Sequence, residues 1–141
     1  MPTHTIIIAE DNPGLARVLS FKFQASGFQP LICRDGQYAW DAFQEGNIAA
    51  ILSDQEMPRM SGIEFCRKVR SVDSDVPFFL VTGRQLELAN RGLESELNIR
   101  QIFGKPFSPA EVVRAVQEAI DESSAGKSAV SHPDVSASGS A

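Results

Sequence analysis

The sequence predicts an α/β fold, a doubly wound parallel sheet of five strands in the order 2-1-3-4-5 with five helices on both faces. Short, continuously apolar segments alternate with segments whose apolar residues recur at helical spacing, which is typical of strand–helix units in a parallel sheet. Acidic residues directly follow two of the apolar segments, and open α/β sheets build their ligand sites at the carboxyl ends of strands. The connections are short, so we expect right-handed crossovers.

The first part of the chain predicts two strand–helix units. A strand over residues 5–9 is followed by a helix that Asn12 caps and that ends at Gly27. A weaker strand covers residues 28–33, and a helix with apolar residues on one side covers residues 37–44.

The middle of the chain predicts two further strands with a capped helix between them. Residues 47–53 form an apolar run of the kind that lies buried on both faces of a parallel sheet. After a loop, Ser61 and Glu64 have the spacing of a capping box, which begins a helix. Residues 76–81 are the fourth strand, with a proline near the start, where a strand tolerates one.

The last part of the domain predicts a fifth strand between two helices of different quality. The helix over residues 86–97 has a narrow apolar face that Gly92 interrupts, so we expect it to be the softest helix. The fifth strand covers residues 98–104, and a second capping box at residues 108–111 begins the last helix.

Composition limits the domain organisation and the classes of partner. The 141 residues, 43% of them hydrophobic and 22% charged, indicate one soluble domain over residues 1–123. Residues 124–141 are rich in Ser, Ala and Gly and are expected to form a disordered tail. The net charge of −5, without a cluster of Lys or Arg, argues against direct contact with nucleic acid. No apolar run reaches the roughly 18 residues of a membrane span and no signal peptide is visible, so no membrane contact and a cytoplasmic location are expected.

The predicted strand order brings several polar side chains to one edge of the sheet. Glu10 and Asp11 end the first strand and Asp54 ends the third, and these two strands are neighbours at the switch point of the sheet. Thr82 and Lys105 end the fourth and fifth strands. Carboxylates combined with a hydroxyl and an ammonium group form a set suited to Mg²⁺ and phosphoryl chemistry.

At these positions the chain resembles the receiver domain of two-component response regulators, which has the CheY-like, flavodoxin-like fold. The resemblance covers nearly everything from residue 6 to residue 122. It rests on four motifs at the ends of predicted strands, which are Glu10-Asp11, Asp54 with Met57-Pro58 and Ser61-Gly62 behind it, Thr82-Gly83, and Lys105-Pro106-Phe107.

The resemblance implies that Asp54 is the phosphoacceptor. Its carboxylate would attack the phosphorus of a phosphohistidine on a sensor histidine kinase or a histidine phosphotransfer protein. Thr82 and Lys105 would bind phosphoryl oxygens, and their movement would change the surface of the fourth helix, fifth strand and fifth helix, where a downstream protein target binds. The chain would then be a phosphoprotein that signals by binding, and not an enzyme beyond assisting its own phosphorylation and dephosphorylation. The resemblance also implies a cis Lys105–Pro106 peptide bond.

The acidic residues predict the Mg²⁺ site in more detail. Mg²⁺ prefers oxygen ligands and keeps some of its waters. Asp11 and Asp54 are expected to supply carboxylate oxygens directly, and Glu56 its backbone carbonyl oxygen. Glu10 is expected to act through a bound water.

Two features depart from the family pattern. Ile102 stands three residues before Lys105, where the family commonly has an aromatic residue, and Phe103 is expected on the opposite side of the sheet. Glu56 and Arg84 are expected at the rim of the site, where a pair across the phosphoryl group would hinder the water that hydrolyses it. The alternative is an exposed ion pair of little effect.

Two other functions stay open. A Mg²⁺-dependent aspartyl phosphatase also uses an Asp at a strand end, but it has a second Asp two residues later, where this chain has Glu56, and residues 55–58 fit the receiver loop better. A phosphorylation-independent receiver-like binding module is the other alternative, and the intact set of polar groups at the strand ends argues against it. The sequence does not distinguish an effector from an intermediate in a phosphorelay.

Overall fold

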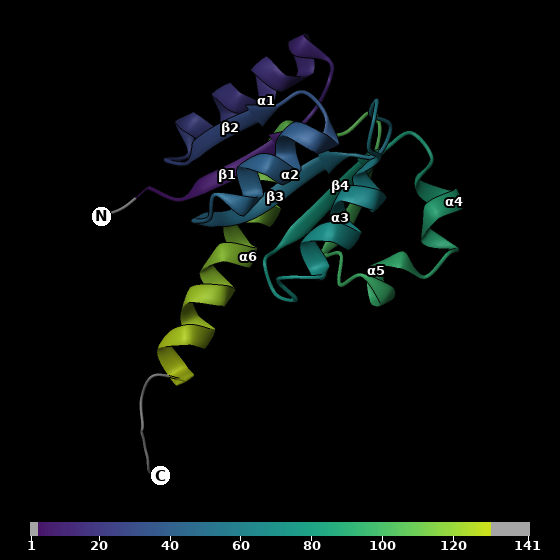
Figure 1. Ribbon diagram of the computed structural model, residues 1–141. Helices are drawn as coiled ribbons and strands as arrows, with labels where there is room; N and C mark the ends of the chain where they lie inside the picture. Colours follow the sequence, from purple (N-terminus) through teal and green to yellow (C-terminus); the bar gives the residue numbers. More distant parts are fainter. Residues whose placement is uncertain (1–2, 131–141) are drawn as a thin grey trace.

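The computed structural model describes residues 3–130, which form a five-stranded parallel sheet covered by helices (Figure 1). The strand order is β2-β1-β3-β4-β5, which confirms the predicted topology. The strands are β1 (Thr5–Ala9), β2 (Gln29–Cys33), β3 (Ile48–Asp54), β4 (Phe78–Thr82) and β5 (Gln101–Gly104). The three inner strands are almost continuously apolar because both of their faces are covered.

Helices lie on both faces of the sheet, as expected for a doubly wound fold (Figure 1). They are α1 (Pro13–Ala25), α2 (Gly36–Gln44), α3 (Gly62–Arg70), α4 (Gln85–Ala89), α5 (Leu93–Glu96) and α6 (Pro109–Val130). Apolar residues of α1 and α6 form one core cluster with the sheet, and those of α2, α3, α4 and α5 form the cluster on the other face. No helix within residues 3–130 is both long and apolar enough to cross a membrane.

The helices that follow the first three strands begin at side-chain caps. Asn12, Asp35 and Ser61 each accept a hydrogen bond from a backbone N–H of the first helical turn, and Ser61 forms a complete capping box with Glu64. These caps hold each helix start close to the end of the preceding strand. The polar residues in the short strand–helix connections are therefore kept at the carboxyl edge of the sheet.

The predicted helix over residues 86–97 is two short helices, α4 and α5. Gly92 separates them with a φ of 69°, a left-handed backbone conformation that glycine adopts without a steric penalty. The interruption at Gly92 was predicted, but the prediction of one helix across it is wrong. Leu88 of α4 and Leu93 of α5 still bury their side chains in the same core cluster, so both short helices pack against the sheet.

Helix α6 continues to Val130, beyond the predicted end of the domain at residue 123. Residues 124–130, which were assigned to the tail, continue this helix, and the domain boundary at residue 123 stays a prediction. Extending an existing helix adds one hydrogen bond for each residue fixed, and Ala and Lys in this segment have good helix propensity. The rest of the predicted tail, residues 131–141, lies outside the described residues.

Strand β2 forms one edge of the sheet. The Gln29 N–H donates to the His4 carbonyl and the Cys33 carbonyl accepts from Glu10, so alternate residues of β2 direct their backbone groups toward β1. By the same alternation, the backbone groups of Pro30 and Ile32 face the free edge. A proline is tolerated there because no ladder hydrogen bond is lost.

Candidate functional site

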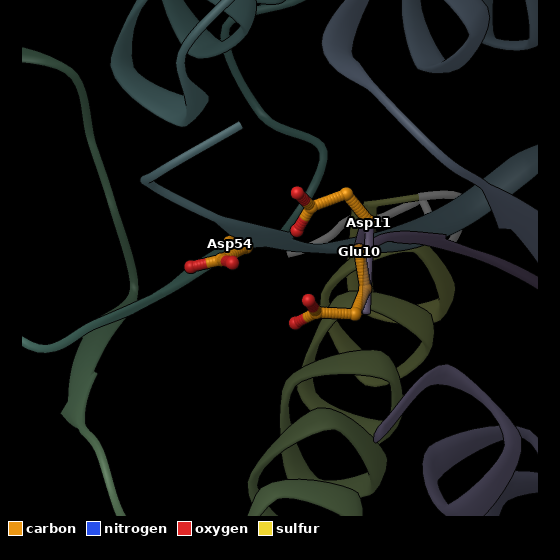
Figure 2. A group of neighbouring side chains, drawn as sticks. All are labelled: Glu10, Asp11 and Asp54. Atoms are coloured by element: carbon orange, nitrogen blue, oxygen red, sulfur yellow. The ribbon is translucent and has the colours of Figure 1, made fainter. Parts of the chain in front are cut away.

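Three carboxylates meet at the carboxyl edge of the sheet, where β1 and β3 end side by side (Figure 2). Glu10, Asp11 and Asp54 each offer a carboxylate oxygen within 4.8 Å of the others. Ala9 pairs with Ser53 in the β1–β3 ladder, which places the residues after them next to each other. The side chain of Asp11 is exposed, whereas only 4% of Glu10 and 3% of Asp54 is accessible to solvent.

The surroundings of Glu10 and Asp54 oppose the ionisation of both carboxyl groups. Burial raises the pKa of Glu10 from 4.5 to about 7, and the negative charge of Asp54 adds to the rise. The Asn12 N–H donates to Glu10 Oε2 at 3.0 Å and only partly opposes this shift. Burial also raises the pKa of Asp54. Such a cluster favours binding of a cation, which removes the repulsion.

Lys105 supplies the positive charge of the site. Its Nζ lies 3.0 Å from Asp54 Oδ2, and a backbone hydrogen bond of 2.9 Å to the Thr82 carbonyl holds the residue at the end of β5. Although partial burial opposes it, the hydrogen bond to Asp54 raises the pKa of Lys105, so the ammonium stays charged. The Lys105–Pro106 peptide bond is cis, as the resemblance implied.

Thr82 is fully buried and its hydroxyl already has a partner. Thr82 Oγ1 donates to Glu56 Oε2 at 2.7 Å and accepts from the Arg84 N–H at 3.0 Å. Glu56 Oε1 lies 3.4 Å from the Gly83 nitrogen, and the Glu56 N–H donates to Asp54 Oδ1 at 3.4 Å. Glu56 therefore connects the two strand ends.

This contact differs from the pairing of Glu56 with Arg84 that was expected across a phosphoryl group, which stays a prediction. No ion pair joins the two side chains within residues 3–130, because the Glu56 carboxylate bonds to Thr82 instead. The offset of two residues after Asp54 correctly indicated a position at the site. Nothing in the sequence indicated the direction of the Glu56 side chain.

The loop after Asp54 is packed closely against the strand end. A Cβ atom on Gly62 would lie 2.5 Å from the Asp54 carbonyl oxygen and 2.7 Å from Leu80 Cδ1, which is too close for any other residue. The Gly62 N–H donates to the Gln55 carbonyl, and the Gln55 side chain accepts from the Ile63 N–H. These contacts hold the start of α3 against the residue that follows the buried carboxylate.

The two residues before the end of β5 face opposite sides of the sheet, as expected. Ile102 packs in the cluster with α2 and α3, whereas Phe103 packs with α1 and α6 and stacks on Phe79 at 6.3 Å between ring centroids. The position of the usual aromatic residue is therefore occupied by a buried aliphatic side chain.

A third buried carboxylate, Asp35, follows β2, and it was not among the predicted site residues. Asp35 Oδ2 accepts from Arg59 Nε at 2.9 Å and from Arg59 Nη2 at 2.7 Å. Asp35 Oδ1 accepts from the Tyr38 N–H at 2.9 Å. Although burial opposes it, these hydrogen bonds lower the pKa of Asp35. The Asp35–Arg59 pair joins residues distant in sequence, so no local pattern revealed it.

The donor set of the carboxylate cluster fits a hard divalent cation. Its ligands are oxygens, several of them are anionic, and one carboxylate is open to solvent, which are the features that Mg²⁺ requires. An ammonium group and a buried hydroxyl stand at the same edge. Together these groups can hold a phosphoryl group beside the Asp54 oxygen.

Comparisons with known proteins agree with this chemistry. The family model for the response regulator receiver domain matches residues 6–117. The chain is 30% identical over 115 residues to the uncharacterized transcriptional regulatory protein YkoG of Bacillus subtilis, with 82% of this chain and 50% of YkoG covered. It is 32% identical over 112 residues to the DNA-binding response regulator MtrA of Mycolicibacterium smegmatis, with 79% of this chain and 48% of MtrA covered. The chain thus spans about half the length of these relatives.

A solved structure resembles the fold over most of its length. It is the receiver domain of sensor histidine kinase PA1611 from Pseudomonas aeruginosa, which has a magnesium ion coordinated in its active site cleft. The TM-score is 0.75 and the sequence identity is 25%, with 85% of this chain and 99% of that domain covered.

Proposed function

The chain belongs to the response regulator receiver family, and on this premise we propose that Asp54 accepts a phosphoryl group from a phosphohistidine on a sensor histidine kinase or a histidine phosphotransfer protein. One observation carries the proposal: a buried carboxylate lies between two other carboxylates and the Lys105 ammonium, at the edge of the sheet where ligands bind. We propose that the receiver domain covers residues 1–123.

The residues of the cluster would hold Mg²⁺. Asp11 and Asp54 supply carboxylate oxygens, Glu56 supplies its backbone carbonyl oxygen, and Glu10 binds through a water. When bound, the cation offsets the negative charge that gathers on the phosphoryl oxygens.

The protein contributes the nucleophile and the groups that hold the transferring phosphoryl group. An Asp54 carboxylate oxygen forms the new bond to phosphorus, and the bond from phosphorus to the donor imidazole breaks, with its electrons staying on the imidazole nitrogen. The Lys105 ammonium binds one phosphoryl oxygen and the Thr82 hydroxyl donates to another. The product is an acyl phosphate on Asp54.

The phosphorylated site would act on the rest of the molecule through Thr82 and Lys105. Both residues lie at the ends of β4 and β5, next to the surface formed by α4, α5, β5 and α6. A downstream protein target that binds this surface would respond to the change. The domain would then be a cytoplasmic signalling module. Its catalysis would be limited to the transfer and hydrolysis of its own phosphoryl group. The acidic net charge of −5 supports a protein rather than nucleic acid as the direct partner of this domain.

Phosphorylation by a small donor tests the proposal. The protein is incubated with acetyl phosphate and Mg²⁺, and the intact mass is measured. The wild type should gain one phosphoryl group, whereas Asp54→Asn and the wild type in EDTA should gain none. Asp35→Asn is a matched control, since it removes a buried carboxylate at the same sheet edge and should leave the gain in mass intact. Phosphorylation of Asp54→Asn would refute the assignment of Asp54.

A further inference from the structure

We propose that Glu56 is a positioning residue whose carboxylate accepts the hydrogen bond of the Thr82 hydroxyl in the unphosphorylated site. This hydrogen bond has to break when Asp54 receives its phosphoryl group. The inference rests on the proposed function of Asp54 and Thr82. It assigns a role to a side chain for which the sequence predicted only a backbone ligand and a different ion-pair partner.

The hydrogen bonds of Thr82 leave no proton for another acceptor. Its single hydroxyl hydrogen goes to Glu56 Oε2 at 2.7 Å, while the Arg84 N–H donates to the hydroxyl oxygen. Thr82 is also 0% exposed, so water does not compete for it. A phosphoryl oxygen on Asp54 can accept from Thr82 only after the contact with Glu56 breaks.

Glu56 also faces a second donor of the site. Its Oε1 lies 3.4 Å from the Gly83 nitrogen, so the two carboxylate oxygens together lie against the Thr82 hydroxyl and the adjacent backbone N–H. The Glu56 carboxylate therefore occupies the two donors to which phosphoryl oxygens would have to bind. The same residue contacts Asp54 through its backbone N–H.

The surroundings of Glu56 favour release of its hydrogen bond with Thr82. Glu56 is an exposed residue and no Lys or Arg side chain pairs with its carboxylate within residues 3–130. Rotation into solvent therefore costs the Thr82 hydrogen bond and leaves no buried charge behind. The negative charge of an incoming phosphoryl group would also repel the carboxylate and favour this rotation.

Competition for the Thr82 hydroxyl can be distinguished from charge repulsion between the Glu56 carboxylate and the phosphoryl group. Glu56→Leu removes both the acceptor and the charge, and it should speed phosphorylation of Asp54 by acetyl phosphate at saturating Mg²⁺ by about fivefold, the effect of one hydrogen bond of ordinary net strength. Glu56 and Glu87 line one hollow between the loop after β3 and α4. Glu87→Gln removes an exposed carboxylate from that hollow that does not contact Thr82, and it should leave the rate unchanged.

A double-mutant cycle identifies the hydroxyl as the point of action. In a Thr82→Val background, Glu56→Leu should lose its accelerating effect, because no hydroxyl is left to compete for. In a Thr82→Ser background, which keeps the hydroxyl, the acceleration should return. Thermal unfolding of each variant checks that it is folded, and Thr82→Ala replaces Thr82→Val if that variant is not.

A readout independent of phosphorylation is available from beryllofluoride, which mimics the phosphoryl group. Its affinity, followed by the Gly83 amide resonance, should rise about fivefold in Glu56→Leu by the same hydrogen-bond argument. Equal acceleration by Glu56→Leu with Thr82 and with Thr82→Val, or no acceleration at all, would overturn the inference while leaving the proposed function intact. A wild type that gains no phosphoryl group on Asp54 would refute the proposed function itself.

Discussion

Two buried carboxylates at the same edge of the sheet, Asp54 at the end of β3 and Asp35 after β2, have pKa values shifted in opposite directions. Only 3% of Asp54 and 5% of Asp35 is exposed, and each accepts from a cationic side chain, Lys105 at 3.0 Å and Arg59 at 2.7 Å. The pKa of Asp54 is nevertheless raised by burial, whereas hydrogen bonds overcome burial and lower the pKa of Asp35.

The neighbours of the two side chains explain the difference. Asp35 accepts from a backbone N–H and from two nitrogens of Arg59, which together satisfy both of its oxygens. Asp54 accepts from the Lys105 ammonium and lies beside the carboxylates of Glu10 and Asp11. Burial and the negative charge of Glu56 raise its pKa, so its charge is opposed as well as paired. A satisfied buried carboxylate stabilises the fold, whereas a crowded one remains available to a cation and to an electrophile. The ion pair by itself does not distinguish the two.

The largest test of this contrast is the pH dependence of stability without metal. Folded Glu10 keeps its proton up to a pH of about 7, and the unfolded chain loses it near 4.5. The folded state thus binds more protons in this window, so the free energy of unfolding should fall by about 3 kcal/mol as the pH rises through it. Urea unfolding in EDTA at a series of pH values measures this change.

Glu10→Gln is the control for this experiment, because the amide cannot ionise and still accepts from the Asn12 N–H. The decline in stability over the window should largely disappear. Asp35 should contribute the opposite slope at lower pH: its lowered pKa gives stability that is present above pH 3.8 and is lost as the pH falls through the folded value. An equal decline in the wild type and in Glu10→Gln would contradict the crowded-carboxylate interpretation.

Neutralising the two aspartates should change stability in opposite directions. Asp35→Ala removes a helix cap and the acceptor for Arg59, and it should lower the free energy of unfolding at pH 7 by about 2 kcal/mol. Asp54→Asn relieves the repulsion within the cluster and should raise it by about 1 kcal/mol. Urea unfolding in metal-free buffer compares them, and changes of the same sign would break the contrast.

Magnesium should have a smaller effect than the pH change or the loss of Asp35. At a Mg²⁺ concentration ten times the dissociation constant, the folded state should gain about 1.4 kcal/mol. Asp11→Asn should lose most of this gain at the same concentration, because it removes the exposed carboxylate of the proposed Mg²⁺ site. Asp35→Ala should keep it in full, measured as the difference in unfolding free energy with and without Mg²⁺. Loss of the response in Asp35→Ala would show that the two regions are not independent.

The fold and the meeting of the carboxylates were predictable because they depend on patterns that a sequence displays. Continuous apolar runs identified the inner strands, caps such as Asn12 and Ser61 located helix starts, and parallel strands place their carboxyl ends at one edge. The proximity of Glu10, Asp11 and Asp54 therefore followed from the order of the strands and the positions of these residues along the chain. The roles assigned to them stay predictions that the phosphorylation experiment tests.

The remaining features depend on side-chain direction and on distant contacts. The position of Glu56 was evident from the sequence, but its choice of Thr82 over Arg84 follows from packing at the strand end. The Asp35–Arg59 pair joins two loops without any periodic signal. The break at Gly92 was visible, yet only the left-handed conformation of that glycine decides that two short helices form.

Strand β2 carries a further consequence for the behaviour of the protein at high concentration. Leu31 and Ile32 are both 41% exposed on this edge, a combination that could serve as a template for fibril growth. Pro30 directs its nitrogen to the free side and has no hydrogen to donate there, so an approaching strand cannot complete the ladder. The pyrrolidine ring thereby acts as a gatekeeper against aggregation, while the opposite side of the strand pairs fully with β1.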